Sequence, residues 1–353
     1  MSAPLEQAYR ARRDGAGHPD QRATFGRLVR VELLRLGRRR AVLGLLLVAV
    51  LVPAITCAVL VVETRPITAA ERAQAEQQRA EYLASDEFAQ SVEDCTKQPA
   101  DFAIEGDPDV DDAPSFVELC RDSLDPGDFV YERSPLTVDD EQDDGSGLFV
   151  VLVLGLTALL AAATSIGHDF ATGSIANQLL VEPRRLRLLA GKLAALVLVA
   201  AVAAGVVLGL YWAVLNGVAA GRGEPAATAS LSSTLQAVGR GMVFASLAAL
   251  LGFALTALLR STVGTLGVLV GTTLLLAIVP STLGSDDTWN PLLSVDALAS
   301  GSAETYRYED CFTVGECGQL STITYVEGLL TVGVILLVLA ASAAWSFRRR
   351  DVR

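Results

Sequence analysis

Six long runs of apolar residues, all free of Asp, Glu, Lys, Arg and His, constrain this chain more than any other feature of its sequence. They occupy residues 41–62, 147–166, 193–215, 242–259, 262–283 and 328–347. A helix needs about 20 apolar residues to cross the hydrocarbon core of a bilayer, and it satisfies its own backbone hydrogen bonds there. The sequence therefore predicts an all-α polytopic membrane protein with six transmembrane helices.

The six runs divide the remaining residues between two sides of the membrane that differ sharply in charge. One side comprises residues 1–40 and 167–192, Arg260 and residues 348–353, with 19 basic and 7 acidic residues. The other side holds 9 basic and 33 acidic residues. Because Lys and Arg near the ends of spans are retained in the cytoplasm, we expect both termini to be cytoplasmic. The acidity of the chain then describes its outer face and indicates no nucleic-acid partner.

Arginine is used far more often than lysine in this chain. Only two lysines, Lys97 and Lys192, occur among the 28 basic residues, and Ala, Val and Leu dominate the chain. This usage is typical of GC-rich coding. We therefore expect a multi-pass protein of a bacterial plasma (inner) membrane.

The largest segment outside the apolar runs lies between the first two of them. Residues 63–146 contain 24 acidic and 6 basic residues, which predicts a small acidic extracytoplasmic domain with a limited core. Residues 66–94 lack glycine and are rich in Ala, Glu, Gln and Arg, a composition that favours a helix continuing outward from the first span. Residues 216–241 and 284–326 are expected to form two further outer loops.

Four of the five cysteines fall on the predicted outer side: Cys95, Cys120, Cys311 and Cys317. An even set in an oxidising compartment predicts two disulfides, although sequence allows three connectivities. We expect each bond to lie within one loop, as Cys95–Cys120 and Cys311–Cys317; the alternative joins the two loops. No histidine lies near either pair and the spacings differ from those of zinc ligands, so no metal site is predicted.

A basic amphipathic segment precedes the first span. Residues 1–22 have the Gly, Pro and mixed charge of a disordered cytoplasmic leader, whereas residues 23–40 place apolar side chains at helical spacing and basic ones mostly elsewhere. This pattern predicts an interfacial helix. Its charged residues include Arg27, Arg30 and Arg35, with Glu32 as the exception in sign. The helix either anchors the chain to lipid or offers a platform to a cytoplasmic partner.

Residues 167–192 form a polar, glycine-containing, basic segment between the second and third spans. Asp169 is placed to cap the next helical segment, and the sequence Thr-Gly-Ser ending at Ser174 interrupts the helix. Ser174 is expected to cap a short helix over residues 175–181, which Pro183 ends. Arginines then lie at headgroup depth before Lys192 opens the third span. A short helix across a cytoplasmic turn would pass a partner's push to two spans together.

These residues resemble the permease subunits of the type-2 ABC exporter family. Its members have six spans, an amphipathic connecting helix, and a coupling helix between spans two and three. In this family the turn after span two begins with an acidic residue followed by an aromatic residue. Next come Gly-Thr or Gly-Ser and an aliphatic residue. A proline with basic residues follows, and Gly-Lys opens the third span. The matching positions here are Asp169, Phe170, Gly173, Ser174, Ile175, Pro183, Arg184, Arg185, Gly191 and Lys192. The leading acid is more often Glu in the family.

The resemblance implies an ATPase-coupling role for those positions and for Gln178 on the same short helix. It likewise implies that the connecting helix, with Arg27, Arg30, Glu32 and Arg35, contacts the same partner. It covers the membrane part of the chain and leaves the acidic outer domain unexplained. The implied partners are a cytoplasmic ABC ATPase, a second permease copy or a related permease, and membrane lipid.

Several chemical motifs are absent from the sequence. It contains no Gly-x-x-x-x-Gly-Lys-Ser/Thr phosphate loop and no carboxylate or histidine in the apolar runs to relay protons. It also lacks a His-Glu-x-x-His metal motif and a Gly-x-Ser-x-Gly elbow. We therefore expect a transport subunit that is not itself an enzyme and carries no cofactor. It would export a substrate, whose identity the spans do not specify, using ATP and Mg bound by a separate ATPase. The alternative is a non-transporting sensor or assembly protein whose acidic outer domain binds a ligand.

Overall fold

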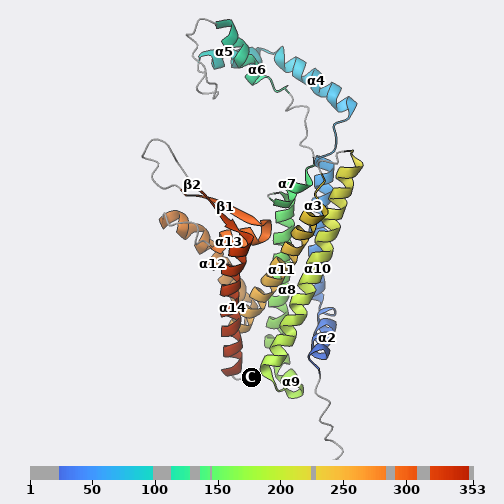
Figure 1. Ribbon diagram of the computed structural model, residues 1–353, viewed down its shortest axis with the longest axis vertical. Coiled ribbons are helices and arrows are strands. Elements are labelled where there is room, and N and C mark those ends of the chain that lie inside the picture. The colour runs from blue at the N-terminus through green and yellow to red at the C-terminus, as the bar shows by residue number, and fades with distance from the viewer. Residues whose placement is uncertain are drawn as a thin grey trace, which may run out of the picture. The chain divides into compact units, whose positions relative to one another are not determined.

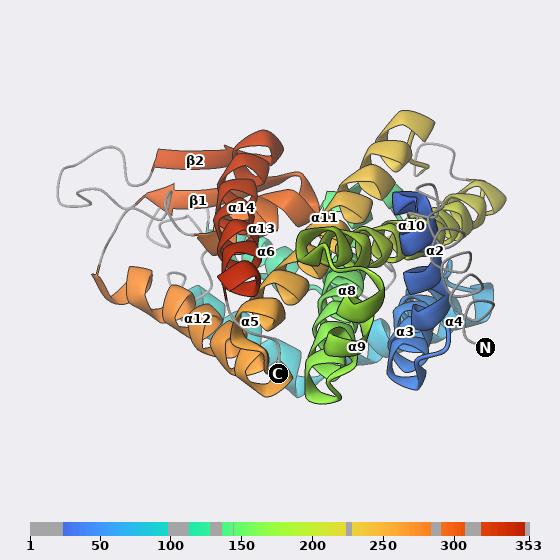
Figure 2. The ribbon, with the colours of Figure 1, turned by 90° about the horizontal axis from the view of Figure 1, so that it is seen from below.

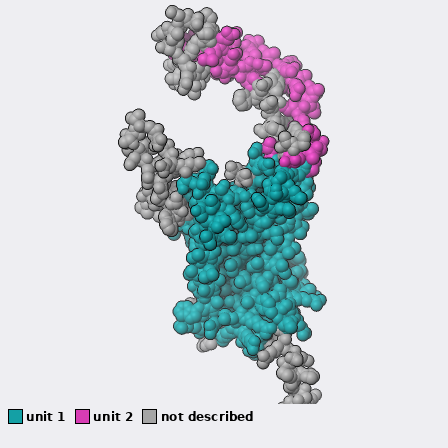
Figure 3. Space-filling view, viewed as in Figure 1, with its two compact units in different colours: residues 1–56, 138–216, 229–353 teal, residues 57–137, 217–228 magenta. Residues whose placement is uncertain are grey.

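The computed structural model describes residues 24–97, 113–127, 136–143, 145–223, 228–283, 291–307 and 319–349. The predicted leader 1–22, the second cysteine pair Cys311 and Cys317, and the end of the tail, 350–353, lie outside these described residues. The chain divides into two compact units (Figure 3). The first comprises residues 1–56, 138–216 and 229–353, and the second residues 57–137 and 217–228.

Within the described residues, five helices are long and apolar enough to cross a membrane (Figure 1). They are α3 (Arg40–Glu63), α8 (Ser146–Ala171), α10 (Arg185–Gly221), α11 (Leu231–Leu259) and α14 (Tyr325–Arg349). The sixth predicted span coincides with α12 (Thr262–Leu283), in which the apolar stretch Thr262–Ile278 is shorter than these five helices. Each predicted run therefore falls on one helix.

The centre of the first unit is the contact between α8 and α11, and α11 also packs against α14. Two glycines permit the close approach: Gly155 lies against the Phe244 ring, and Gly252 lies against the carbonyl of Leu159. A Cβ at either position would collide with its neighbour, and small residues are what bring membrane helices together. Viewed along the bundle, α3 and α14 lie on opposite sides of this pair (Figure 2).

The second unit does not continue the first span as one helix, which corrects the expectation from composition. Helix α3 ends at Glu63, and α4 (Ala69–Leu83) begins afresh with a capping box between Thr68 and Glu71. Pro66 explains the interruption, because proline has no amide hydrogen and disfavours helical backbone in the residue before it. The strong local cap at Thr68 then starts the new helix.

A disulfide holds together the two helices that come next in the second unit. Helices α5 (Asp86–Lys97) and α6 (Ala113–Leu124) are joined by Cys95–Cys120, with a Cα–Cα distance of 6.0 Å. Both cysteines are fully buried beside Phe88 and Val92. So small an apolar cluster is a weak core by itself, and the covalent bond compensates for it.

A helix and a small antiparallel sheet occur within residues 284–326, for which the sequence predicted an outer loop. Helix α13 (Pro291–Ser300) packs against α14 and is followed by β1 (Ser302–Arg307) and β2 (Gln319–Thr324). The register pairs Ser302 with Thr324 and Arg307 with Gln319. Ala297, Ala303 and Ile323 form the core of this element. The fold is therefore helical throughout its apolar part but carries a two-stranded sheet that the all-α prediction lacked.

Candidate functional site

The predicted amphipathic helix is α2 (Phe25–Leu36), and it docks on the beginning of α10. Its buried residues are Leu28, Glu32 and Leu36. The Leu28 side chain occupies the space where a Cβ of Gly191 would stand. Glycine at position 191 therefore lets α2 lie directly against α10. Arg27 and Arg30, by contrast, are exposed to the surroundings of the chain.

The interrupted segment after α8 folds as a tight turn into the short helix α9 (Ser174–Val181). Gly173 has a φ of +65°, a left-handed conformation that favours glycine. This residue is the N-cap of α9, and no side chain caps the helix. The prediction that Ser174 is the cap is thus corrected. Its hydroxyl instead donates to the Asp169 carboxylate at 3.2 Å, and Gln178 donates to the Ser174 hydroxyl at 3.0 Å.

Helix α10 begins at Arg185, earlier than the apolar run alone predicted. The break after α9 is confined to Glu182, Pro183 and Arg184. Residues 185–192 are mostly Arg, Leu, Ala and Lys, which are good helix formers, so the helix resumes directly after the proline. As a consequence, Arg185 and Lys192 are held on a helix and not on a loop.

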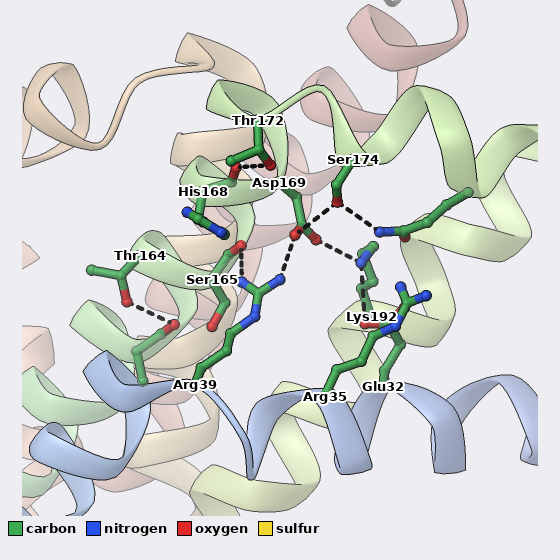
Figure 4. Close-up of polar contacts among 12 residues, drawn as sticks. Glu32, Arg35, Arg39, Thr164, Ser165, His168, Asp169, Thr172, Ser174 and Lys192 are labelled. Carbon is green, nitrogen blue, oxygen red and sulfur yellow. Dashed lines mark hydrogen bonds and ion pairs between the residues drawn. The ribbon is translucent and has the colours of Figure 1, made fainter.

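A buried ion network lies where α2, α8 and α10 meet, and we define it as Glu32, Arg35, Arg39, Asp169 and Lys192 (Figure 4). At its centre the Lys192 ammonium donates to Asp169 Oδ2 at 2.7 Å and to Glu32 Oε2 at 3.1 Å. Lys192 and Glu32 are each 6 % exposed and Asp169 is 2 % exposed. The lysine thus bridges two carboxylates away from solvent.

Two arginines complete the network from its edges. The Arg39 guanidinium donates to Asp169 Oδ1 and, at 2.6 Å, to the Ser165 carbonyl. Arg35 donates to Glu32 Oε1 at 3.2 Å. Arg39 lies in the short connection between α2 and α3, so the network also fixes the angle at which the first span leaves α2. Sequence analysis had not selected Arg39.

In the buried ion network, each buried charged group lies next to groups of opposite charge. Moving an isolated ion out of water costs several kcal/mol, which only close opposite charges and hydrogen bonds offset. Both carboxylates have basic partners, and the one buried ammonium has two acidic partners. Relative movement of α2, α8 or α10 at this end would separate these charges in a poorly hydrated place. The three helix ends are therefore expected to move together.

A second set of contacts joins the end of α8 to α11 and α14. The Phe170 ring meets the Phe347 ring edge-on at 6.4 Å, and the Arg260 guanidinium lies 5.6 Å from the centre of the Phe170 ring. Arg185 donates to the Phe347 carbonyl at 3.4 Å. Movement of the α8–α9 turn is thereby linked to α14 as well.

Helix α9 itself has one covered face and one open face. Ile175 is 1 % exposed, whereas Leu180 is 85 % exposed and Asn177 is also exposed. Pro183 and Arg184, in the connection between α9 and α10, are exposed too. Among the described residues, Leu180 is the most exposed of the large apolar side chains.

The predicted coupling and connecting-helix residues have different surroundings in the structure. Asp169, Ser174, Gln178 and Lys192 meet Glu32 and Arg35 in and around the ion network. Phe170, Ile175 and Arg185 pack against the bundle, and Gly173 forms the turn. Pro183 and Arg184 lie at the surface beside Leu180, and Arg27 and Arg30 lie on the open side of α2.

Comparison with known proteins identified a protein family. Residues 28–352 match the family model described as ABC-2 family transporter protein. No curated protein and no solved structure matched the chain. The matched range contains α8 to α10 and all but the first residues of α2, and thus the whole buried ion network.

Proposed function

The chain belongs to the ABC-2 family of transporter proteins and is thus a multi-pass membrane permease component of an ABC transporter, and from this premise we propose that it exports its substrate by coupling to a separate cytoplasmic ATPase. The observation that carries the proposal is the buried ion network. It joins α2, α8 and α10, and the Ser174 hydroxyl links it to α9 through Asp169. Force applied to α9 therefore has a direct path to several spans.

In this proposal the partner ATPase binds ATP and Mg and docks on α9. Leu180 would enter an apolar pocket of the partner, with Asn177 and Arg184 forming polar contacts around it. Large apolar side chains at the centre of an interface, surrounded by polar groups, are the usual source of binding energy. Arg27 and Arg30 would contact the same partner or the lipid headgroups from the open side of α2.

In this proposal the transport step depends on two sets of contacts made by α8: the ion network with α2 and α10, and the ring contact with α14. ATP binding would draw the two ATPases together and displace α9 with them. The ion network would carry α2 and α10 along, and the contact between Phe170 and Phe347 would carry α14. The bundle would then exchange an inward-open for an outward-open arrangement, driven by the different affinity of the ATPase for the two states.

The membrane setting and assembly belong to the same proposal. Both termini and α9 would be cytoplasmic, six spans would cross a bacterial plasma membrane, and the second unit would lie outside the cell. A second copy of this chain or a related permease would complete the pathway. The exposed apolar side chains of α12, which include Val263, Val270 and Leu274, are available for lipid or for that second subunit.

The first test compares two leucines at opposite ends of the bundle. Leu180→Glu on α9 should abolish copurification of the ATPase and reduce coupled ATP hydrolysis on the order of tenfold or more, as expected for loss of an interface hot spot. Leu231→Glu at the start of α11 is the control, since Leu231 is 75 % exposed and lies near Ser233, which contacts Asp139 before the start of α8, whereas α9 follows the end of α8. Equal hydrolysis in the two variants would place the docking surface elsewhere.

A second measurement addresses the existence of the partner. The wild-type chain, solubilised from its host membrane, should capture an ATPase that carries a phosphate-loop motif. If no such ATPase is captured, and none is encoded beside the chain, the export proposal fails. The sensor or assembly role would then be the better account of the acidic outer unit.

A further inference from the structure

A cavity of about 590 Å³ lies beside the ion network, against the neighbouring face of α8 that bears Thr164 and His168. Arg38, Arg39 and Arg40 line it from the connection to α3, and His168 lines it from α8. Figure 4 shows His168 and Thr164 together on this side of the helix. The remaining lining residues are small or apolar, with Thr262 at the start of α12.

The cavity carries positive charge that nothing in the described residues neutralises. Arg39 is committed to Asp169. Within the described part of the chain, the guanidinium groups of Arg38 and Arg40 have no acidic partner, and the exposed His168 ring has none either. Arginine side chains that line one hollow provide donors for an oxyanion, and the planar guanidinium suits phosphate in particular.

The position of the cavity along the chain indicates where such an anion comes from. Arg40 is the first residue of α3, and the apolar run begins at Ala41, which also lines the cavity. Basic residues directly before a span lie at the level of the lipid headgroups. Val42 also lines a second cavity, of about 40 Å³, between α3, α8 and α10, and the lining of that cavity is almost wholly apolar. A cationic hollow that adjoins an apolar groove matches an amphiphile.

We propose that the cavity between the α2–α3 connection and α8 binds the phosphate group of an anionic membrane lipid, with Arg38, Arg40 and His168 as its donors. The lipid chains would lie against α3 and α8. Because Arg39 lines both this cavity and the ion network, the bound phosphate would sit beside the hinge between α2 and the first span. The proposal is independent of the export function.

The test measures lipid adducts of the full-length purified chain by native mass spectrometry. Phosphatidylglycerol should bind in preference to zwitterionic phosphatidylcholine. Arg38→Gln with Arg40→Gln should weaken phosphatidylglycerol binding on the order of 30-fold, given the typical contribution of each basic residue near anionic lipid. The control is Arg72→Gln with Arg121→Gln, which removes the same charge from exposed positions of the second unit and should leave binding unchanged.

Two further variants distinguish a built site from general surface charge. Ala41→Phe fills the cavity without altering charge and should also weaken phosphatidylglycerol binding, and His168→Gln should weaken it less than the arginine pair does. Equal losses in the two arginine pairs would overturn the proposal, as would undiminished binding in both Ala41→Phe and the Arg38 and Arg40 variant.

The source of the phosphate is settled by a parallel thermal unfolding series with inorganic phosphate alone. Stabilisation by phosphatidylglycerol but not by inorganic phosphate would identify a lipid site. Equal stabilisation by both, lost on substitution of Arg38 and Arg40, would keep the phosphate site but assign it to a soluble ligand. Stabilisation by neither would overturn it.

Discussion

Lysine occurs only twice in this chain, and its two side chains have opposite surroundings. Lys192 is 6 % exposed and lies between Asp169 and Glu32. Lys97 pairs with Glu93 at 2.6 Å, but its side chain is 62 % exposed at the end of α5. An exposed pair competes with water and salt, so it adds little to stability. A buried lysine that loses its charge leaves two carboxylates without their central partner.

The first prediction concerns this contrast. Lys192→Met should destabilise the chain by about 3–5 kcal/mol, the typical cost of breaking a buried ion pair from one side, whereas Lys97→Met should have little effect. Unfolding of the purified protein in mixed micelles, followed by circular dichroism, measures both. If the two methionine variants unfold alike, the ion network contributes no more than a surface pair.

Sequence analysis identified most members of the network but not their partnership. Glu32 stood out as an acid among arginines, and Lys192 as one of two lysines, yet they lie 160 positions apart. Pairing at that separation depends on how α2 docks against Gly191, which no local pattern encodes. Arg39 was missed because it is one of three consecutive arginines. Only the backbone turn between α2 and α3 directs it to Asp169 while its two neighbours face the cavity.

At the level of elements, local chemistry predicted the interruptions better than the helix bounds. The break at Gly173 and the end of α9 before Pro183 result from glycine and proline, and the structure has both. The early start of α10 was missed because hydropathy marks only the apolar part of a helix, whereas residues 185–192 include the three basic side chains Arg185, Arg187 and Lys192. The hairpin was missed because β1 and β2 are joined by a segment, 308–318, with no two-residue turn signal.

An ion pair that spans two elements of the second unit leads to the next prediction. Arg79 of α4 donates through Nε to Asp125 Oδ1 at 2.7 Å, just beyond α6. This guanidinium, and then the Gly127 amide, hold the pKa of the Asp125 carboxyl below its ordinary value. The folded state therefore binds the proton less well than the unfolded state. The stabilisation is fully present above the unfolded pKa, near 4, and is lost as the pH falls through the lower folded pKa.

Hydrogen exchange in the full-length chain tests this at the level of the helices. Amides of α4 should lose protection below about pH 4, after correction for intrinsic exchange rates. Asp125→Asn should show reduced protection already at pH 6 and a weaker pH dependence. Asp122→Asn, an exposed neighbour on α6, is the control and should behave as wild type. If the pH dependence of protection is unchanged in Asp125→Asn, groups other than Asp125 cause it.

On the scale of the whole molecule, the six apolar runs predicted the membrane class, and each run falls on one helix, although only five of these helices are long and apolar enough to cross a membrane within the described residues. They left undetermined which helices touch. The α8–α11 contact depends on Gly155 and Gly252 meeting Phe244 and the Leu159 backbone, and glycines are common in membrane spans whether or not a neighbour is close. The family match over residues 28–352 agrees with the predicted class, but the sidedness of each loop still rests on charge counting.

Sidedness is therefore the last prediction. With α12 crossing the membrane, Ser261 before it and Glu304 after it must lie on opposite sides, and the basic side that includes Arg184 must be cytoplasmic. Single substitutions Arg184→Cys, Ser261→Cys and Glu304→Cys place a thiol at exposed positions on both sides. In intact cells an impermeant maleimide should add label, relative to the unsubstituted chain, only to Glu304→Cys, and disruption of the membrane should expose the other two. If neither Ser261→Cys nor Glu304→Cys is labelled until the membrane is disrupted, α12 is re-entrant, which leaves five spans and places the two termini on opposite faces of the membrane.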